Sequence, residues 1–255
     1  MRATWSFLAM TLRSRARRLL GLLAFGTVFL LAGATARLVS AGEHGHMELD
    51  ALFGLGGTTL VSALLLLAWL IGRFAIIAVL VLMSGVFSDD RAAGHARLYA
   101  VRPCSFVALY AARFAMLCAL AFMLAALIMP AFDWIVLGEW IGWTAIVLIA
   151  AQIIVFGSLT ALCSVATRAD AWVALFLGVF ALVWDALRRL DFFNTAAPLV
   201  RQLISMLLPP QGALVRIETA FASTQPVPWD AFLYVAVYGA LVLLIAGTAL
   251  ARRDI

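Results

Sequence analysis

Residues 84–103 read SGVFSDDRAAGHARLYAVRP, a short charged stretch between two long apolar segments. The apolar segment before it begins near Thr58 and carries one charge, Arg73, and the segment after it extends to Met129. In a membrane protein, a short polar helix held between two spans is a place where a soluble partner can act on membrane helices. The location of this stretch relative to the membrane is therefore the first question.

The whole chain has the composition of an integral membrane protein. Of its 255 residues, 65% are hydrophobic and only 12% are charged, whereas soluble domains have about 25% charged residues. Several apolar runs approach or exceed the roughly 20 residues that a helix needs to cross a bilayer. None shows the alternating pattern of a membrane β-barrel. The predicted fold class is an all-α integral membrane protein, with residues 1–255 forming one transmembrane domain.

Six transmembrane helices and two interfacial regions are predicted. Residues 1–18 place apolar side chains on one side of a helical wheel and arginines elsewhere, which favours an interfacial amphipathic helix over a signal peptide. Residues 192–228 contain five prolines, so they are predicted to form an outer hairpin of re-entrant or interfacial helices, about 198–208 and 211–222. The spans are predicted at residues 19–36, 58–87, 106–129, 141–166, 171–187 and 229–251.

Two details of the spans follow from local sequence. The second apolar segment is longer than a bilayer requires, so its helix is expected to tilt, to break near residues 54–57, or to extend into the cytoplasm. The third span is expected to end at Pro130.

The arginines predict the orientation of the chain. All 18 basic residues are arginines, and with six spans eleven of them lie outside the bilayer on the side of the N-terminus, against five on the other side. The positive-inside rule therefore places both termini and the link, residues 88–105, in the cytoplasm. This distribution explains the net charge of +5 through membrane topology, so no nucleic-acid partner is predicted. The expected location is a bacterial inner membrane.

Arg73 is the costliest residue at membrane depth, since a charge there costs at least about 2.5 kcal/mol unless it is paired or hydrated. Counted inward from the cytoplasmic ends of their spans, Arg73 and Asp185 lie at similar depths. One interpretation is an Arg73–Asp185 ion pair. In the other, Asp185 pairs with Arg188 or Arg189, and Arg73 snorkels or faces a water-filled cavity.

The sequence offers two weaker chemical hypotheses. His44 and His46 lie in an outer loop with carboxylates and a methionine, which are possible copper or zinc ligands, although a solvated loop explains them equally well. No histidine falls inside a predicted span, so Ser158 lacks a base there, and Gly157-Ser158 is interpreted as a small-residue helix contact. The chain is therefore not expected to be an enzyme.

The link resembles that of the ABC-2 type permeases, the membrane subunits of a class of ATP-driven transporters. The resemblance extends to the basic N-terminal helix, the six spans, the proline-rich region before the last span and the terminal Arg-Arg-Asp. The chain departs from the family where it has Gly94-His95 and Leu98-Tyr99 in place of Gly-Thr and Leu-Leu. The link residues that carry the resemblance and are expected to couple to an ATPase are Asp89, Asp90, Arg91, Gly94, Arg97, Leu98, Arg102 and Pro103.

The resemblance implies a permease, most simply an exporter, that binds a separate ATPase subunit and a second permease chain, identical or paralogous. The chain has no lysine and hence no GxxxxGK[ST] loop. ATP and Mg²⁺ are therefore expected on the partner subunit, with no cofactor on this chain. A membrane scaffold that forms no transport pathway is the alternative, and a membrane-embedded enzyme is the third.

Overall fold

The computed structural model describes residues 2–41, 70–94, 105–138, 142–190, 204, 208–223 and 225–252. Within these residues every regular element is a helix, so the all-α prediction is confirmed for this part of the chain. The helices are α1 (Arg2–Ala41), α4 (Phe74–Met83), α5 (Ser88–Ala92), α7 (Phe106–Leu137), α8 (Trp143–Ala166), α9 (Asp170–Arg189), α11 (Gln211–Ala222) and α12 (Trp229–Ala251).

Five of the described helices are long and apolar enough to cross a membrane, which makes the chain a multi-pass membrane protein. These candidate spans are Ser6–Thr35, Val107–Ile135, Trp143–Ala166, Asp170–Arg188 and Trp229–Ala251. The second predicted span, residues 58–87, is described only from residue 70 onward, and α4 within it has 10 residues.

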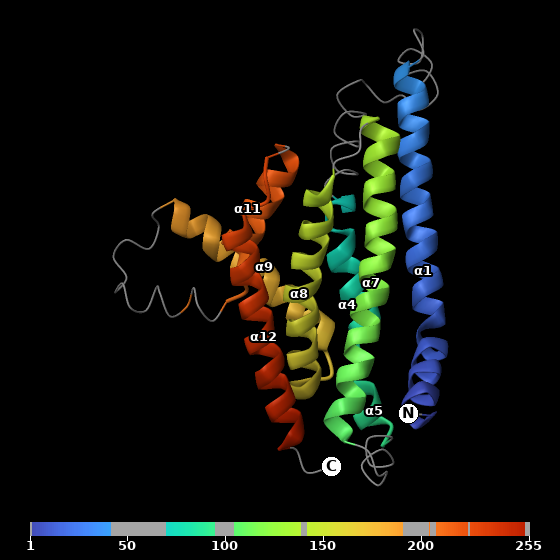
Figure 1. Cartoon of the computed structure of the whole chain (residues 1–255), viewed down its shortest axis with the longest axis vertical. Helices are drawn as coiled ribbons and strands as arrows, with labels where there is room; N and C mark the ends of the chain where they lie inside the picture. Colours follow the sequence, from blue (N-terminus) through green and yellow to red (C-terminus); the bar gives the residue numbers. More distant parts are fainter. Residues whose placement is uncertain are drawn as a thin grey trace.

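Helix α8 lies at the centre of the bundle and packs against α4, α7, α9, α11 and α12, while α1 packs along α7 (Figure 1). Small residues permit this close packing. A Cβ atom at Gly157 would lie 3.2 Å from the Cys118 sulfur of α7 and 3.4 Å from a methyl of Val79 on α4. Ser158 is fully buried and donates to the Val155 carbonyl of its own helix. The Gly157-Ser158 pair thus lies at a helix contact.

The structure corrects two predicted helix boundaries. Helix α1 is continuous, so the interfacial helix predicted at residues 1–18 and the first span are one helix. Helix α7 continues through Pro130 to a left-handed cap at Gly138, because neighbouring helices in a bundle tolerate proline. The second apolar segment has a break at Gly72 and Arg73, while the alternative of a break near residues 54–57 lies outside the described residues and stays a prediction.

The first turn of α1, the end of α12 and helix α5 all lie at the same end of the molecule (Figure 1). Helix α11 lies toward the opposite end, beside α8 and α12, and α9 runs obliquely to the upright helices. Helix α11 covers the second helix predicted in the outer hairpin, about 211–222, whereas most of the first, about 198–208, lies outside the described residues.

Candidate functional site

The candidate site is the elbow, residues 84–94, in which a turn after α4 leads into the five-residue helix α5. Gly85 permits the turn because its φ is +74°, a conformation that side chains disfavour. The Gly85 N–H donates to the Asp170 carboxylate at 2.8 Å, and the Ser88 hydroxyl donates to the same oxygen at 3.2 Å. The backbone of the elbow is therefore attached to the start of α9.

Ser164 of α8 fixes the entry to α5. Its hydroxyl oxygen accepts from the backbone N–H groups of Phe87 and Ser88, at 2.9 and 3.1 Å. These groups lie at the N-terminus of α5, where a helix has no acceptors of its own. Arg91, at the other end of α5, donates to the Val165 carbonyl at 3.1 Å and lies 5.8 Å from the centre of the Phe87 ring.

Asp90 joins α5 to α7 through a buried ionic contact. Its carboxylate lies 2.5 Å from the Arg113 guanidinium and accepts from the Tyr110 hydroxyl at 2.7 Å. The side chains of Arg113 and Asp90 are only 6% and 13% exposed. The Arg113 guanidinium also lies 5.7 Å from the Phe7 ring of α1, so this contact joins three helices.

Two arginines of α1 also contact the elbow. Arg15 and Arg18 both donate to the Ser84 carbonyl, and Arg18 also donates to the Val81 carbonyl at 3.1 Å. These carbonyls lie at the C-terminus of α4, where cations are stabilised by the helix dipole. The two guanidinium groups also lie 3.5 and 4.0 Å from the Asp89 carboxylate.

Asp89 of the elbow has a carboxyl group with a shifted pKa. Burial raises the pKa of its carboxyl above the ordinary value, Arg18 opposes this shift, and the nearby carboxylates of Asp170 and Asp90 add to it. For the pKa of Asp89, desolvation and the neighbouring carboxylates therefore outweigh the attraction of Arg18 and Arg113.

The predicted site residues divide into two groups. The structure brings Asp89, Asp90 and Arg91 together on α5, and Gly94 follows in an exposed turn with φ +73°. The remaining predicted coupling residues lie outside the described residues, as do His44 and His46, so their roles stay predictions. The undescribed coupling residues are Arg97, Leu98, Arg102 and Pro103.

The predicted Arg73–Asp185 pair is replaced by two other ion pairs. Arg73 lies 3.1 Å from Glu218 of α11, and Asp185 lies 3.2 Å from Arg188, one turn along α9. The prediction used only the similar depths of Arg73 and Asp185 in their spans. Depth does not indicate which face of α9 carries Asp185, so it could not identify the partner. The pairing of Asp185 with Arg188 agrees with the alternative interpretation of the sequence, whereas the contact of Arg73 with Glu218 agrees with neither interpretation.

Sequence reasoning also missed several residues that build the elbow. Arg113 falls within the predicted third span, and its partner Asp90 lies 23 residues earlier. A charge inside an apolar run was the available signal for Arg113, as it was for Arg73. No comparable signal identified the other contributors, which sit at predicted helix ends where polar residues are ordinary: Arg15, Arg18, Ser164 and Asp170.

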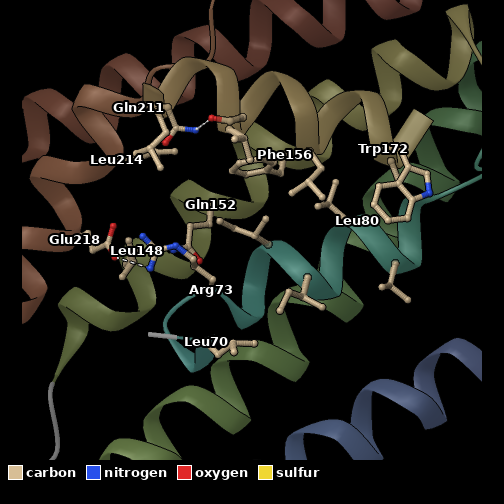
Figure 2. A pocket seen from close by; sticks show the side chains of 18 of the residues that line it. Leu70, Arg73, Leu80, Leu148, Gln152, Phe156, Trp172, Gln211, Leu214 and Glu218 are labelled. Carbon is tan, nitrogen blue, oxygen red and sulfur yellow. Dashed lines mark hydrogen bonds and ion pairs between the residues drawn. The ribbon is translucent and has the colours of Figure 1, made fainter. Parts of the chain in front are cut away.

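A mainly apolar cavity of about 610 Å³ lies between α4, α8, α9 and α11. Arg73, Gln152 and Glu218 lie together at one end of it, and Leu80 and Trp172 lie toward the other end (Figure 2). The Gln152 amide donates to the Gly72 carbonyl at 3.0 Å, across the break before α4. This volume is in the range of small-molecule sites.

Comparisons with models of protein families, with curated proteins and with solved structures found no match for this chain. Within the described residues, no three histidine, cysteine, aspartate or glutamate side chains gather as a metal site would require. Two features of the described residues remain as candidate sites. One is the elbow, which contacts four long helices, and the other is the cavity with Arg73 and Glu218 at one end.

Proposed function

We propose that the chain is the membrane permease subunit of an ABC-2 type transporter, which exports a substrate using ATP hydrolysed by a separate subunit. One observation carries the proposal. The short helix α5 lies at the same end as the start of α1 and the end of α12, and its polar contacts reach α1, α7, α8 and α9.

This arrangement suits the transmission of force. A soluble ATPase that moves α5 pulls on α7 through Asp90 and Arg113, and on α9 through Ser88 and Asp170. Packed helices respond to such a pull by shifting between discrete arrangements rather than by deforming continuously. A solvated loop that only connected two spans would not need a buried ion pair, whose desolvation is costly.

The energy source belongs to another chain in this proposal. With no lysine, the sequence has no P-loop, so ATP and Mg²⁺ bind the partner ATPase. Two permease chains, identical or paralogous, would complete the pathway in a bacterial inner membrane, with both termini in the cytoplasm.

The experiment is purification of the tagged chain from its native membranes, followed by measurement of ATPase activity in the purified material. Ala92 is exposed on α5, so Ala92→Arg should leave the fold intact while obstructing a docked subunit. We expect vanadate-sensitive ATPase activity with the wild type and a loss of about tenfold with Ala92→Arg.

Ala251→Arg is the matched control, because Ala251 is an exposed alanine at the same end of the molecule but on α12. It should retain the co-purified activity. Absence of an ATPase from the wild-type preparation would contradict the proposal and favour a scaffold, and equal losses in both variants would remove the role of α5.

A further inference from the structure

The cavity between α4, α8, α9 and α11 has features that the proposed function does not use. We propose that it binds a membrane phospholipid whose head group carries both a phosphate and a primary ammonium, with the head group at the Arg73–Glu218 end. This inference is independent of the proposed function, since binding needs neither an ATPase nor transport.

The charged end of the cavity presents one cation and one anion to the same space. Arg73 and Glu218 both line the cavity, and their side chains remain 25% and 36% exposed although their charged atoms lie 3.1 Å apart. A guanidinium binds phosphate oxygens through paired hydrogen bonds, and a carboxylate accepts from an ammonium. A head group with both charges satisfies both residues, whereas a purely anionic head group is repelled by Glu218.

Gln152 supplies a second, independent observation at the same end. The residue is only 3% exposed, and its side-chain carbonyl oxygen has no hydrogen-bond partner among the described residues, although its amide nitrogen donates to Gly72. A buried acceptor without a hydrogen bond is unfavourable, so a ligand donor that reaches it is favoured. Because Gln152 also lines the cavity, this oxygen is an acceptor for the ammonium of a bound head group.

The remainder of the cavity suits an acyl chain. Apolar side chains such as Ile77, Leu80 and Phe156 form most of its walls along α4, whose 10 residues correspond to about 15 Å, and Arg18 of α1 lines the cavity as well. One wall belongs to α9, a candidate membrane span, where Trp172 and Val179 are 75% and 52% exposed. The cavity is thus bordered by a surface that faces lipid, which gives a membrane lipid direct access.

The test is native mass spectrometry of the purified full chain in detergent, titrated with single-chain lysophosphatidylethanolamine or lysophosphatidylglycerol. We expect the wild type to bind the ethanolamine lipid at least tenfold more tightly than the glycerol lipid. Glu218→Gln should abolish this preference, since it removes the anion that recognises the ammonium. Val179→Trp, at an exposed position on the cavity wall, should weaken binding of both lipids by narrowing the space.

Arg216→Gln is the matched control. Arg216 lies on α11 like Glu218 and pairs with Asp230 at 2.8 Å, but it does not line the cavity. This variant should bind both lipids as the wild type does. Equal binding of the two lipids by the wild type would overturn the assigned lipid class. Unchanged binding in both Glu218→Gln and Val179→Trp would overturn the assigned location.

Discussion

Two arginine–carboxylate contacts in this chain have the same chemistry and opposite surroundings. Asp90 of the elbow and Arg113 of α7 are 13% and 6% exposed, and the Tyr110 hydroxyl also donates to the Asp90 carboxylate. Arg73 and Glu218 line a cavity, 25% and 36% exposed. A buried pair mainly holds a structure together, because separating it leaves an uncompensated charge, whereas an accessible pair can exchange its partner for a ligand. We therefore infer that the Arg113–Asp90 pair stabilises the elbow and that the Arg73–Glu218 pair is accessible to a ligand.

The largest expected effect comes from breaking the buried pair. Asp90→Ala leaves the Arg113 guanidinium buried without its carboxylate, which should cost roughly 3–5 kcal/mol of stability. Chemical denaturation of the purified chain in detergent measures this change. The double variant Asp90→Ala/Arg113→Met removes both charges and should recover part of the loss. A single variant as stable as the wild type would show that the pair does not hold the elbow.

Gly85→Ala should have the next largest effect, and Gly94→Ala is its control. Both glycines have φ near +74°, where alanine is disfavoured by about 1–2 kcal/mol. At Gly85 the added methyl would also overlap the Asp89 carboxylate, while at Gly94 it would meet nothing within 4 Å. Denaturation midpoints should therefore fall further for Gly85→Ala. Equal losses would mean that the elbow accommodates the methyl without displacing Asp89.

Neutralising the accessible pair should change stability much less. Glu218→Gln keeps the shape of the side chain at a partly exposed position, so we expect a loss of at most about 1 kcal/mol in the same denaturation assay. A loss as large as that of Asp90→Ala would remove the contrast between the two pairs, because it would show that the Arg73–Glu218 contact is also structural.

The smallest effect concerns the pH dependence of the elbow. Because burial raises the pKa of the Asp89 carboxyl, the folded chain binds this proton more tightly than the unfolded chain. Stability from this group is therefore present at pH values below the unfolded pKa and is lost as pH rises through the folded pKa. Asp89→Asn removes this loss, so its stability relative to the wild type should increase as pH rises from the unfolded to the folded pKa. Thermal unfolding of both proteins between about pH 4 and 7 measures the trend, and a constant difference would contradict it.

The sequence predicted the features that depend on composition and periodicity. It did not predict the features that depend on which helices pack together in the fold. Apolar length located α8 and α12 within two residues of their observed ends, since crossing a bilayer sets that length. It did not reveal that α7 passes through Pro130, because neighbouring helices compensate a proline only in the folded bundle.

The candidate sites show the same division. Charges in apolar runs identified Arg73 as needing a partner, but the partner lies on α11, which follows a proline-rich region whose path the sequence does not define. The sequence of the link, residues 88–105, was enough to identify the charged residues of α5. Their attachment to Arg113, Ser164 and Asp170 depends on how α7, α8 and α9 pack around the elbow, and no local sequence pattern encodes that packing.

The most direct test of the central claim, that α5 receives an ATPase, is site-specific photo-crosslinking in native membranes. A photoreactive amino acid replaces Ala92 in one protein and Ala251 in the control, both exposed and at the same end of the molecule. We predict that the Ala92 position forms a covalent adduct with a P-loop ATPase and that the Ala251 position forms much less. The account would be contradicted if no ATPase is crosslinked at position 92, or if equal amounts of ATPase are crosslinked at both positions.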